Sequence, residues 1–326
     1  MSKLVTIYGG SGFLGRYIAQ RMAREGWRVR VAVRRPNEAM QVKPYGTVGQ
    51  VEPVFCNIRN DESVRSVMLG ADAVVNCVGI LNEHGANSFD AIQHEGAERI
   101  ARIAAEQGVG QLVHLSAIGA SVTAASKYSK SKGMGEEGVL KYFPSAVILR
   151  PSAIFGTEDK FFNKFAKMTR LGPVLAIVGG DTKLQPVYVD DVAQAAVKGV
   201  LGQASGTYEL GGPEVLSLGE IVNLMLKVIK RKRLVLNLPF WAGSIVGAGF
   251  DAVQAVTLGL VRNGILTRDQ VKSLRYDSVV CDGAKGFADL GITPTAMEAV
   301  LPDYLWPFRP AGQFSAIKES AKNLNA

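Results

Sequence analysis

The stretch Val5-Thr6-Ile7-Tyr8-Gly9-Gly10-Ser11-Gly12-Phe13-Leu14-Gly15-Arg16 decides the fold of this chain. Its apolar first part is typical of a buried strand, and three regularly spaced glycines, Gly9, Gly12 and Gly15, follow it. An amphipathic helical pattern then runs over 13–23. The stretch therefore predicts a strand, a tight turn and a helix N-terminus, an arrangement that can hold a phosphate group.

Each glycine has a separate part in such a turn. Gly9 permits the sharp bend, Gly12 lets a pyrophosphate approach the backbone, and Gly15 lets the helix pack closely on the strand. The free N–H groups and the positive end of the helix dipole then face the anion. An ordinary glycine-rich turn is the alternative. We predict a dinucleotide site that includes Gly9, Gly10, Ser11, Gly12, Phe13, Leu14, Gly15 and Arg16.

The end of the second predicted strand, over 28–33, indicates which dinucleotide is bound. Arg34 and Arg35 follow this strand, and no acidic residue occurs there before Glu38. An acidic residue at this point would bind the ribose 2′-hydroxyl of NAD, whereas arginine suits a 2′-phosphate. Arg16 can supply a second guanidinium group. We therefore predict NADPH; the alternative is that the two arginines are only a solvated strand end.

Strands and helices alternate along the first half of the chain. Six predicted strands lie at 4–8, 28–33, 52–57, 73–79, 112–116 and 146–150. Such alternation predicts an α/β fold with a doubly wound parallel sheet, which binds ligands at the carboxyl ends of its strands. We expect the cofactor to be lined there by Asn57, Ile58, Cys77, Val78, Gly79, Ser116, Pro151 and Ile154.

The length and composition of the chain limit the kind of protein. The 326 residues suit a nucleotide-binding domain over 1–160, onto which later strands and helices pack back, and a smaller mixed α/β domain over 161–326. The net charge of +8 favours anionic partners. No aromatic-basic motif points to nucleic acid, and the three histidines have no metal-ligand spacing, so we expect neither partner. Because the first strand starts at residue 4, we also expect no targeting peptide.

Tyr128 and Lys132 form a Tyr-x-x-x-Lys pattern on a helix predicted over 128–142, and Ser116 ends the preceding strand. The two side chains lie one turn apart on one face. A neighbouring ammonium group favours the phenolate, so we expect a lowered pKa at Tyr128. Such a tyrosine could protonate a carbonyl oxygen, held also by Ser116, while NADPH delivers hydride.

The glycine turn together with Ser116, Tyr128 and Lys132 resembles the extended or atypical short-chain dehydrogenase/reductases, which are NAD-dependent epimerase/dehydratase-like proteins of Rossmann type. In that family these three residues would be catalytic. The stretches at 128–136, 149–163 and 185–193 further resemble the NADPH-binding accessory subunits of respiratory complex I. This resemblance implies a tightly held NADPH, other complex I subunits as partners, and no independent turnover. The alternative is a free NADPH-dependent reductase or epimerase.

Two departures from the general reductase pattern bear on activity. Asn57 stands where an aspartate often binds adenine, and an amide can serve there. The segment 117–127 is short and consists largely of small residues, in contrast to the longer stretch that covers a sugar nucleotide in many extended reductases. Tyr128 and Lys132 could therefore hold the nicotinamide ribose without turnover.

A basic cluster over 227–233 precedes an apolar run over 234–261. The run is long enough to cross a bilayer, but its proline, its glycines, Asp251 and Gln254 disfavour a free-standing span. A docking surface for a membrane or a partner subunit and an ordinary core helix are the alternatives. We expect a peripheral location on the cytoplasmic face of a bacterial inner membrane, or on the matrix side in a mitochondrion. The tail over 302–326 is predicted to be extended and to end in a short polar helix.

Overall fold

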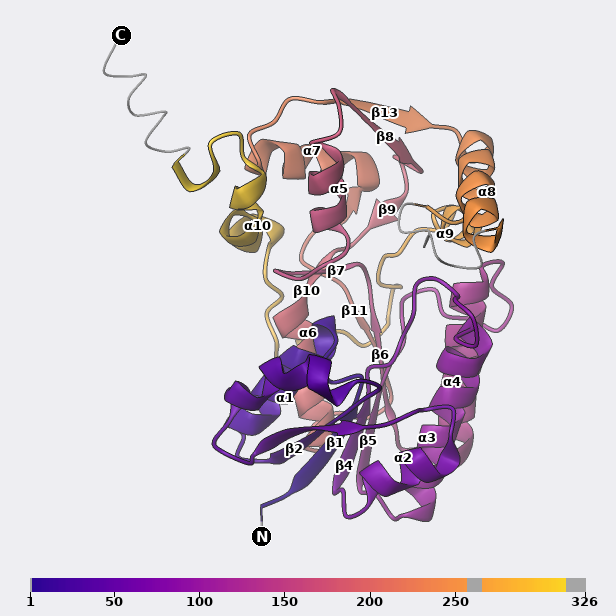
Figure 1. The fold of residues 1–326 in the computed structure, drawn as a ribbon, viewed down its shortest axis with the longest axis vertical. Coiled ribbons are helices and arrows are strands. Elements are labelled where there is room, and N and C mark those ends of the chain that lie inside the picture. The colour runs from indigo at the N-terminus through magenta and orange to yellow at the C-terminus, as the bar shows by residue number, and fades with distance from the viewer. Residues whose placement is uncertain (1, 257–265, 315–326) are drawn as a thin grey trace.

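The computed structural model describes residues 2–256 and 266–314. The chain forms two lobes: a first lobe around a seven-stranded parallel sheet, and a second lobe of short sheets and helices (Figure 1). The α/β fold with a doubly wound parallel sheet is confirmed. A boundary near residue 160 stays a proposal, because elements from both halves of the chain contribute to the first lobe.

The sheet of the first lobe has the order β11-β6-β5-β4-β1-β2-β3. Its strands are β1 (Leu4–Tyr8), β2 (Arg28–Val33), β3 (Val51–Phe55), β4 (Ala73–Asn76), β5 (Gln111–Leu115), β6 (Val147–Pro151) and β11 (Thr207–Leu210). The strand order reverses at β1, where Tyr8 lies opposite Ala32 of β2 on one side and Asn76 of β4 on the other. Ligands of such sheets bind at this reversal, and the glycine turn begins there.

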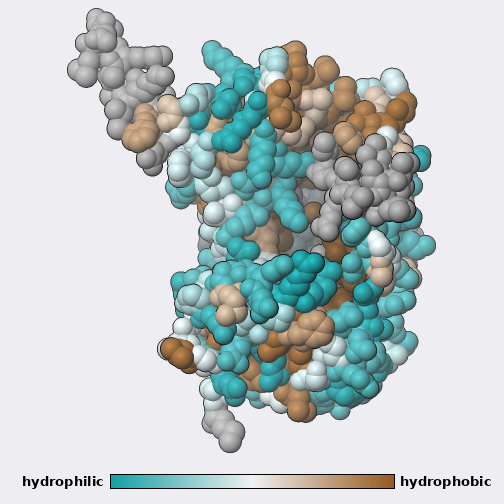
Figure 2. Space-filling model, in the orientation of Figure 1, coloured by the Kyte–Doolittle hydropathy of each residue, from teal (hydrophilic) through white to brown (hydrophobic). Residues whose placement is uncertain are grey.

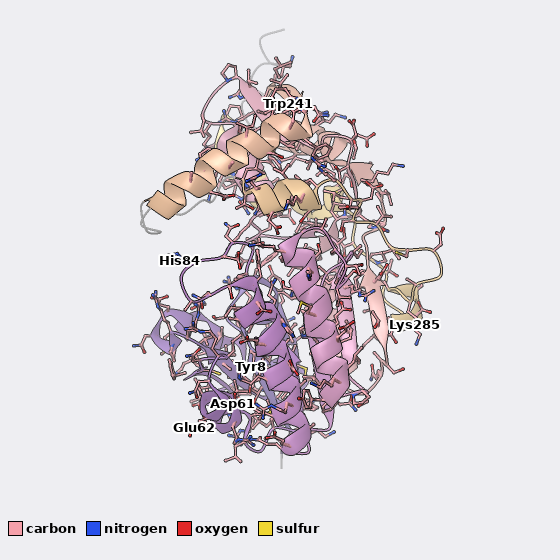
Figure 3. The ribbon with its side chains drawn as sticks, turned by 90° about the vertical axis from the view of Figure 1, so that its right-hand side faces the viewer. Tyr8, Asp61, Glu62, His84, Trp241 and Lys285 are labelled. Atoms are coloured by element: carbon pink, nitrogen blue, oxygen red, sulfur yellow. The ribbon has the colours of Figure 1, made fainter. Side chains whose placement is uncertain are left out.

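Helices cover both faces of the sheet because alternate strand residues point to opposite sides. Val5, Ile7 and Val31 face α1 (Phe13–Arg24) and α6 (Val189–Val200). Tyr8 and Ala32 face the other group of helices. These are α2 (Asp61–Met68), α3 (Glu95–Glu106) and α4 (Lys127–Tyr142). Figure 3 shows α3 and α4 side by side across this face.

Two local features complete the first lobe. One π-helical turn, Asp90–His94, precedes α3. The segment after β2 contains a 3-10 helix, Pro36–Tyr45, because Pro36 suits a helix start and both Ala39 and Val42 are buried against the sheet.

The second lobe contains three two-stranded sheets and five α-helices among the described residues. The strand pairs are β7 (Ile154–Phe155) with β10 (Val187–Tyr188), β8 (Val174–Val178) with β13 (Leu234–Leu238), and β9 (Lys183–Leu184) with β12 (Leu216–Ser217). The helices are α5 (Phe162–Met168), α7 (Leu218–Val228), α8 (Phe240–Val256), α9 (Arg268–Ser273) and α10 (Met297–Leu305). Short 3-10 helices cover Ala288–Leu290, Trp306–Phe308 and Gly312–Phe314. A separate core packs α5, α7 and α10 together.

The prediction of an extended tail from residue 302 was wrong for 302–314. Pro302 lies inside α10, and the following 3-10 helix brings Phe308 into the core of the second lobe. Three guanidinium groups hold this turn: Arg231 donates to Phe308 O, Arg170 donates to Pro307 O, and Arg309 donates to Val228 O. Residues 315–326, where a short polar helix was expected, lie outside the described residues.

The apolar run predicted over 234–261 is not one element. It divides into β13 and α8, separated at Pro239, and its last residues, 257–261, lie outside the described part of the chain. Within residues 2–256 and 266–314, no helix combines the length and the apolar character needed to cross a membrane.

Candidate functional site

The glycine turn joins β1 to α1 at the point where the strand order reverses. Gly9 has a φ of 76°, a left-handed conformation that favours glycine, and its N–H donates to Ala32 O. A Cβ on Gly15 would lie 2.4 Å from Gly9 O. Gly12 is the N-cap of α1 and has no side chain to cap the helix. The first N–H groups of α1, on Phe13 and Leu14, are therefore available to an anion.

Arg16 contacts this turn, and two further arginines follow the neighbouring strand β2. The Arg16 guanidinium forms an ion pair with Glu158 at 3.1 Å and donates to Ser11 O and Gly12 O. Arg34 and Arg35 are exposed just after the carboxyl end of β2, and Arg35 pairs with Glu38 at 2.9 Å. A cationic edge therefore lies where an adenosine ribose would reach in this type of fold.

The ends of β3 and β4 bring further predicted residues to the same edge. Asn57 Oδ1 accepts a hydrogen bond from the N–H of Arg59, and Ile58 is buried behind it. Cys77 continues β4 and donates its N–H to Tyr8 O. The next predicted residues, Val78 and Gly79, bring the chain to Lys132: a Cβ on Gly79 would lie 3.6 Å from Lys132 Nζ.

Ser116, Tyr128 and Lys132 belong to the adjoining end of β5 and the first turns of α4. Lys132 is buried, and its ammonium group donates to Leu115 O at 2.8 Å. Ser116 is also buried, and its Oγ has no hydrogen-bond partner among the described residues. Pro151 at the end of β6 accepts from the N–H of Ile118, and Ile154 follows in β7.

The expected lowering of the pKa of Tyr128 was wrong for this structure. Removal of the hydroxyl group from solvent raises the pKa of Tyr128 to about 12. The Lys132 ammonium is engaged by the carbonyl of Leu115, and burial lowers the pKa of Lys132 to about 8. Tyr128 packs edge-on against Phe89, with ring centroids 6.0 Å apart. The tyrosine is thus a weak acid at neutral pH.

Gln93, which the sequence reasoning missed, supports this group together with other buried polar residues. Gln93 is buried, accepts from the N–H of Ile80 and donates to Ser131 Oγ at 2.8 Å. The glycines of α4 are the signal in the sequence for the close packing of α4 on the Gln93 segment, since a Cβ on Gly135 would lie 2.2 Å from Gln93 O. Asn76 and His114 form a second pair, with Nδ2 and Nδ1 3.1 Å apart. Burial lowers the pKa of His114 to about 3, so its imidazole is neutral.

These features fit an NAD(P) nucleotide. The turn is a backbone cradle that side chains on Gly9 or Gly15 would disrupt, and the helix N-terminus behind it has no side-chain cap. Deeper in the same edge, the buried Ser116 hydroxyl lacks a partner among the described residues. Among residues 2–256 and 266–314, no group of His, Cys, Asp and Glu lies where it could hold a metal ion.

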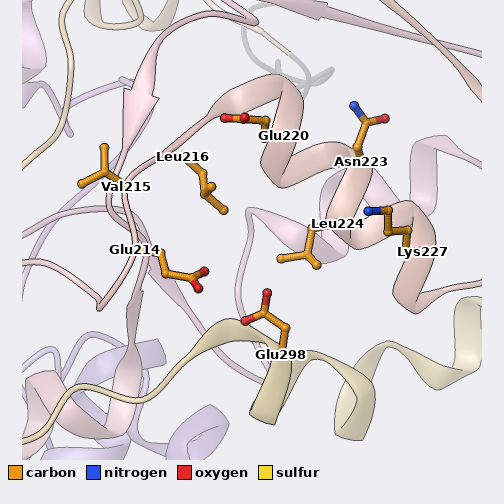
Figure 4. Close-up of a pocket in the computed structure, with 8 residues that line it drawn as sticks. All are labelled: Glu214, Val215, Leu216, Glu220, Asn223, Leu224, Lys227 and Glu298. Atoms are coloured by element: carbon orange, nitrogen blue, oxygen red, sulfur yellow. The ribbon is translucent and has the colours of Figure 1, made fainter.

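Two hollows lie away from these residues. One, of about 690 Å³, lies between α7, α10 and the residues around β12, and Glu214, Glu220, Glu298 and Lys227 line it (Figure 4). Another, of about 490 Å³, lies beside Asp181, Asn237 and Arg275. Neither contains a residue of the predicted nucleotide site, and both are shallow hollows of the second lobe.

Comparison with curated proteins finds relatives that extend over nearly the whole chain. The chain is 34% identical over 316 residues to a protein of Arabidopsis thaliana named NADH dehydrogenase [ubiquinone] 1 alpha subcomplex subunit 9, mitochondrial, which covers 95% of this chain and 79% of the relative. The mouse protein of that name is 31% identical and covers 90% of this chain and 78% of the relative. A ceramide reductase of Caulobacter vibrioides is 28% identical and covers 78% of this chain and 79% of the relative.

Comparison with solved structures supports the fold. DesIV, a dTDP-glucose 4,6-dehydratase of Streptomyces venezuelae with NAD and TYD bound, has a TM-score of 0.69 at 19% identity and covers 96% of this chain and 99% of its own. The sequence profile of the NAD dependent epimerase/dehydratase family matches residues 5–211, which include β1 through β11 of the sheet. The chain belongs to the NAD dependent epimerase/dehydratase family.

Proposed function

We propose that this protein is an NADPH-binding accessory subunit of respiratory complex I, the NADH:ubiquinone oxidoreductase, without independent turnover. The observation that carries the proposal is the extent of the similarity to the plant and mouse subunits, 95% and 90% of this chain. The similarity therefore includes the second lobe, whereas the family profile ends at residue 211. The glycine turn of the first lobe is the proposed nucleotide site.

We propose the following roles for the site residues. The N–H groups of Phe13 and Leu14 and the backbone of 9–12 would bind the pyrophosphate, while Asn57 and Ile58 would contact the adenine. The remaining strand-end residues, Cys77, Val78, Gly79, Pro151 and Ile154, would line the cofactor. Ser116, Tyr128 and Lys132 would hold the nicotinamide ribose and amide. When bound, the nucleotide could supply a hydride.

Two features favour a binding role over turnover. A phenol with a pKa of about 12 is a poor proton donor near neutral pH, because efficient acid catalysts have a pKa close to the working pH. The segment 117–127 between Ser116 and Tyr128 is short, so it offers little cover for a second substrate.

The preference for NADPH depends on Arg34, Arg35 and Arg16. We expect Arg34→Ala to weaken NADPH binding about tenfold or more, since a charge-assisted hydrogen bond contributes about 1.5–3 kcal/mol. NADH binding should hardly change. Titration of the purified protein with both nucleotides measures this difference. Arg28→Ala is the matched control, because Arg28 is exposed at the opposite end of the same strand. An equal loss of NADH and NADPH affinity in Arg34→Ala would contradict a 2′-phosphate contact.

The second lobe provides the surface for assembly. Exposed apolar side chains gather on β13 and α8, among them Leu234, Leu236, Trp241 and Ile245. Figure 2 shows this apolar surface at the upper edge of the molecule. The basic residues of 227–233 precede it in the chain. An apolar face next to a cationic segment suits a partner subunit at an anionic membrane surface. We therefore propose a peripheral location on the cytoplasmic face of a bacterial inner membrane or on the matrix side of a mitochondrial one.

The decisive experiment is native separation of gently solubilised membranes from cells that carry a tagged copy of the chain. We expect the protein to migrate with NADH:ubiquinone oxidoreductase activity and to release NADPH after denaturation. Migration as a free monomer or dimer would contradict the subunit assignment, and material that releases no nucleotide would contradict the binding role.

A free NADPH-dependent reductase is the second candidate, favoured by the similarity to the ceramide reductase and by the position of Ser116, Tyr128 and Lys132 at the end of β5 and the start of α4. NADPH oxidation against a panel of carbonyl compounds and quinones tests it. Turnover that disappears in Tyr128→Phe would support this candidate, whereas turnover that persists would exclude Tyr128 as the acid.

A further inference from the structure

The N-terminus of α4, which carries Tyr128, is capped from the second lobe. Asp269 of α9 accepts hydrogen bonds from the N–H groups of Lys127 at 2.8 Å and Tyr128 at 3.0 Å. It also accepts from Ser126 Oγ at 3.1 Å, and Ser126 in turn accepts from the N–H of Ser129. The capping groups of this helix therefore come from residues that are more than a hundred positions apart.

The same short helix also reaches the loop that packs on the Tyr128 ring. Gln270, next to Asp269, donates to Asn82 Oδ1 at 3.3 Å. Asn82 belongs to the loop between β4 and α3, and Phe89 at the end of this loop packs edge-on against Tyr128. The backbone and the ring of Tyr128 thus both depend on where α9 lies.

On its other side, α9 is held by α8. The N–H of Arg268 donates to Asp251 Oδ2 at 3.1 Å, and a Cβ on Gly247 would lie 3.0 Å from that nitrogen. After α9, the Arg275 guanidinium lies 5.5 Å from the centre of the Phe240 ring, at the start of α8. Figures 1 and 3 both show α9 between α8 and α4. The exposed face of α8, with Trp241 at its outer end in Figure 3, belongs to the proposed docking surface.

We propose that Asp269 is a positioning residue that couples nucleotide binding beside Tyr128 to the α8 docking surface. The inference rests on the proposed function and deepens it by naming the connection between its two sites. A nucleotide that orders Tyr128 and the first turn of α4 favours the placement of α9 in which Asp269 caps that turn, and α9 in turn orders α8. By linkage, a partner that orders α8 strengthens nucleotide binding by the same factor.

Hydrogen exchange of the purified full chain tests this coupling, with and without saturating NADPH. In the wild-type protein we expect NADPH to slow amide exchange in α8 (residues 241–252) and α9 by about fivefold, the lower end of typical coupling factors. Asp269→Ala should bind NADPH but show no such slowing. Asp269→Asn keeps one acceptor oxygen, so NADPH should slow exchange in α8 and α9 less than it does in the wild type. A purely structural role of Asp269 would not predict such an intermediate response to NADPH.

Glu220→Ala is the matched control, since Glu220 caps α7 of the same lobe away from α4. Its response to NADPH should equal that of the wild-type protein. NADPH binding without slower exchange in α8 and α9 of the wild type would overturn the coupling and leave the proposed function intact. An equal response in Asp269→Ala would also overturn it. A wild-type protein that binds no NADPH would overturn both proposals.

Discussion

The environment of individual site residues comes from contacts with residues that are distant in the sequence. Lys132 lies one turn from Tyr128, yet its ammonium group donates to the carbonyl of Leu115 on β5. Ser116 is buried at the end of that strand without a partner for its hydroxyl among the described residues. Their residue types indicate dehydrogenase-like chemistry, whereas the proposed role of holding a nucleotide depends on these tertiary contacts.

Gly15 is the residue of the turn that tolerates a side chain least. A Cβ there would lie 2.4 Å from Gly9 O and 2.7 Å from Gly10 Cα, so backbone would have to move. We expect Gly15→Ala to weaken NADPH binding more than tenfold and to lower stability by about 1–3 kcal/mol, the usual cost of overpacking. Gly172→Ala is the control, because no described atom lies within 4 Å of its added Cβ. Titration measures the NADPH affinity and thermal unfolding measures the stability. Unchanged NADPH affinity in Gly15→Ala would contradict the close packing of Gly15 on Gly9.

The buried ammonium group of Lys132 makes a prediction about pH. Burial lowers its pKa from 10.5 to about 8, so between these values the unfolded chain binds more protons than the folded protein. Stability therefore rises with pH across this window. Without nucleotide, the free energy of unfolding of wild type relative to Lys132→Met should rise by about 2 kcal/mol from pH 7 to 9.5.

Urea unfolding at several pH values measures this rise. Lys130→Met is the control, because Lys130 is an exposed lysine on the same helix. The difference in the free energy of unfolding between wild type and Lys130→Met should not change from pH 7 to 9.5. A difference between wild type and Lys132→Met that stays constant with pH would show that Lys132 is not shifted.

At the scale of elements, α8 differs from the other long helices because one of its faces exposes large apolar side chains. Gly243 packs on Val178 and Gly247 on the start of α9, so the inner face lies close to its neighbours. Trp241 and Ile245 on the outer face are 68% and 66% exposed. A contiguous exposed apolar face of this kind is typical of an interaction surface.

The α8 face should therefore matter for assembly and not for folding. We expect the double variant Trp241→Ser, Ile245→Ser to change stability by less than about 0.5 kcal/mol, as surface substitutions do, and to lose migration with complex I on a native gel. Leu69→Ser, a similarly exposed leucine on the first lobe, is the control and should assemble normally. Normal assembly of the double variant would show that the partner lies elsewhere.

At the scale of the whole molecule, buried carboxyl groups join elements that are far apart in the chain within each lobe. Arg150 of β6 binds Glu136 of α4 and lies 3.5 Å from Glu209 of β11. Asp159 accepts from the Tyr304 hydroxyl at 2.6 Å and from the N–H of Asn163, which joins α10 to the start of α5. Burial raises the pKa of Asp159 despite these hydrogen bonds.

Tyr304→Phe removes one partner of this buried carboxyl group. We expect it to lower the free energy of unfolding by about 1–3 kcal/mol, the cost of leaving a buried polar group short of a partner. Thermal or urea unfolding measures the loss. Tyr276→Phe, at an exposed tyrosine of the same lobe, should unfold like the wild type. Equal stability of the two variants would mean that the Tyr304 hydroxyl does not support the lobe.

What the sequence alone could predict was local. Short-range patterns predict the strand, glycine turn and helix of residues 4–24, the alternation of elements and the parallel sheet. They do so because apolar residues that are buried on one face recur every 2 residues in a strand and about every 3.6 residues in a helix. The capping box of α7, Ser217 with Glu220, is equally local. The candidate site residues at the strand ends could be named for the same reason.

Only the tertiary structure decided what these residues meet. Arg16 pairs with Glu158, Lys132 donates to Leu115 O, and Asp269 caps the N-terminus of α4. Residues 302–314, predicted to be an extended tail, are packed helix. These contacts join residues far apart in the chain, and a hydrogen bond or a buried environment depends on three-dimensional distance. The sequence therefore determined the kind of fold and predicted the kind of ligand, while tertiary packing determined the burial and anchoring of the candidate site residues.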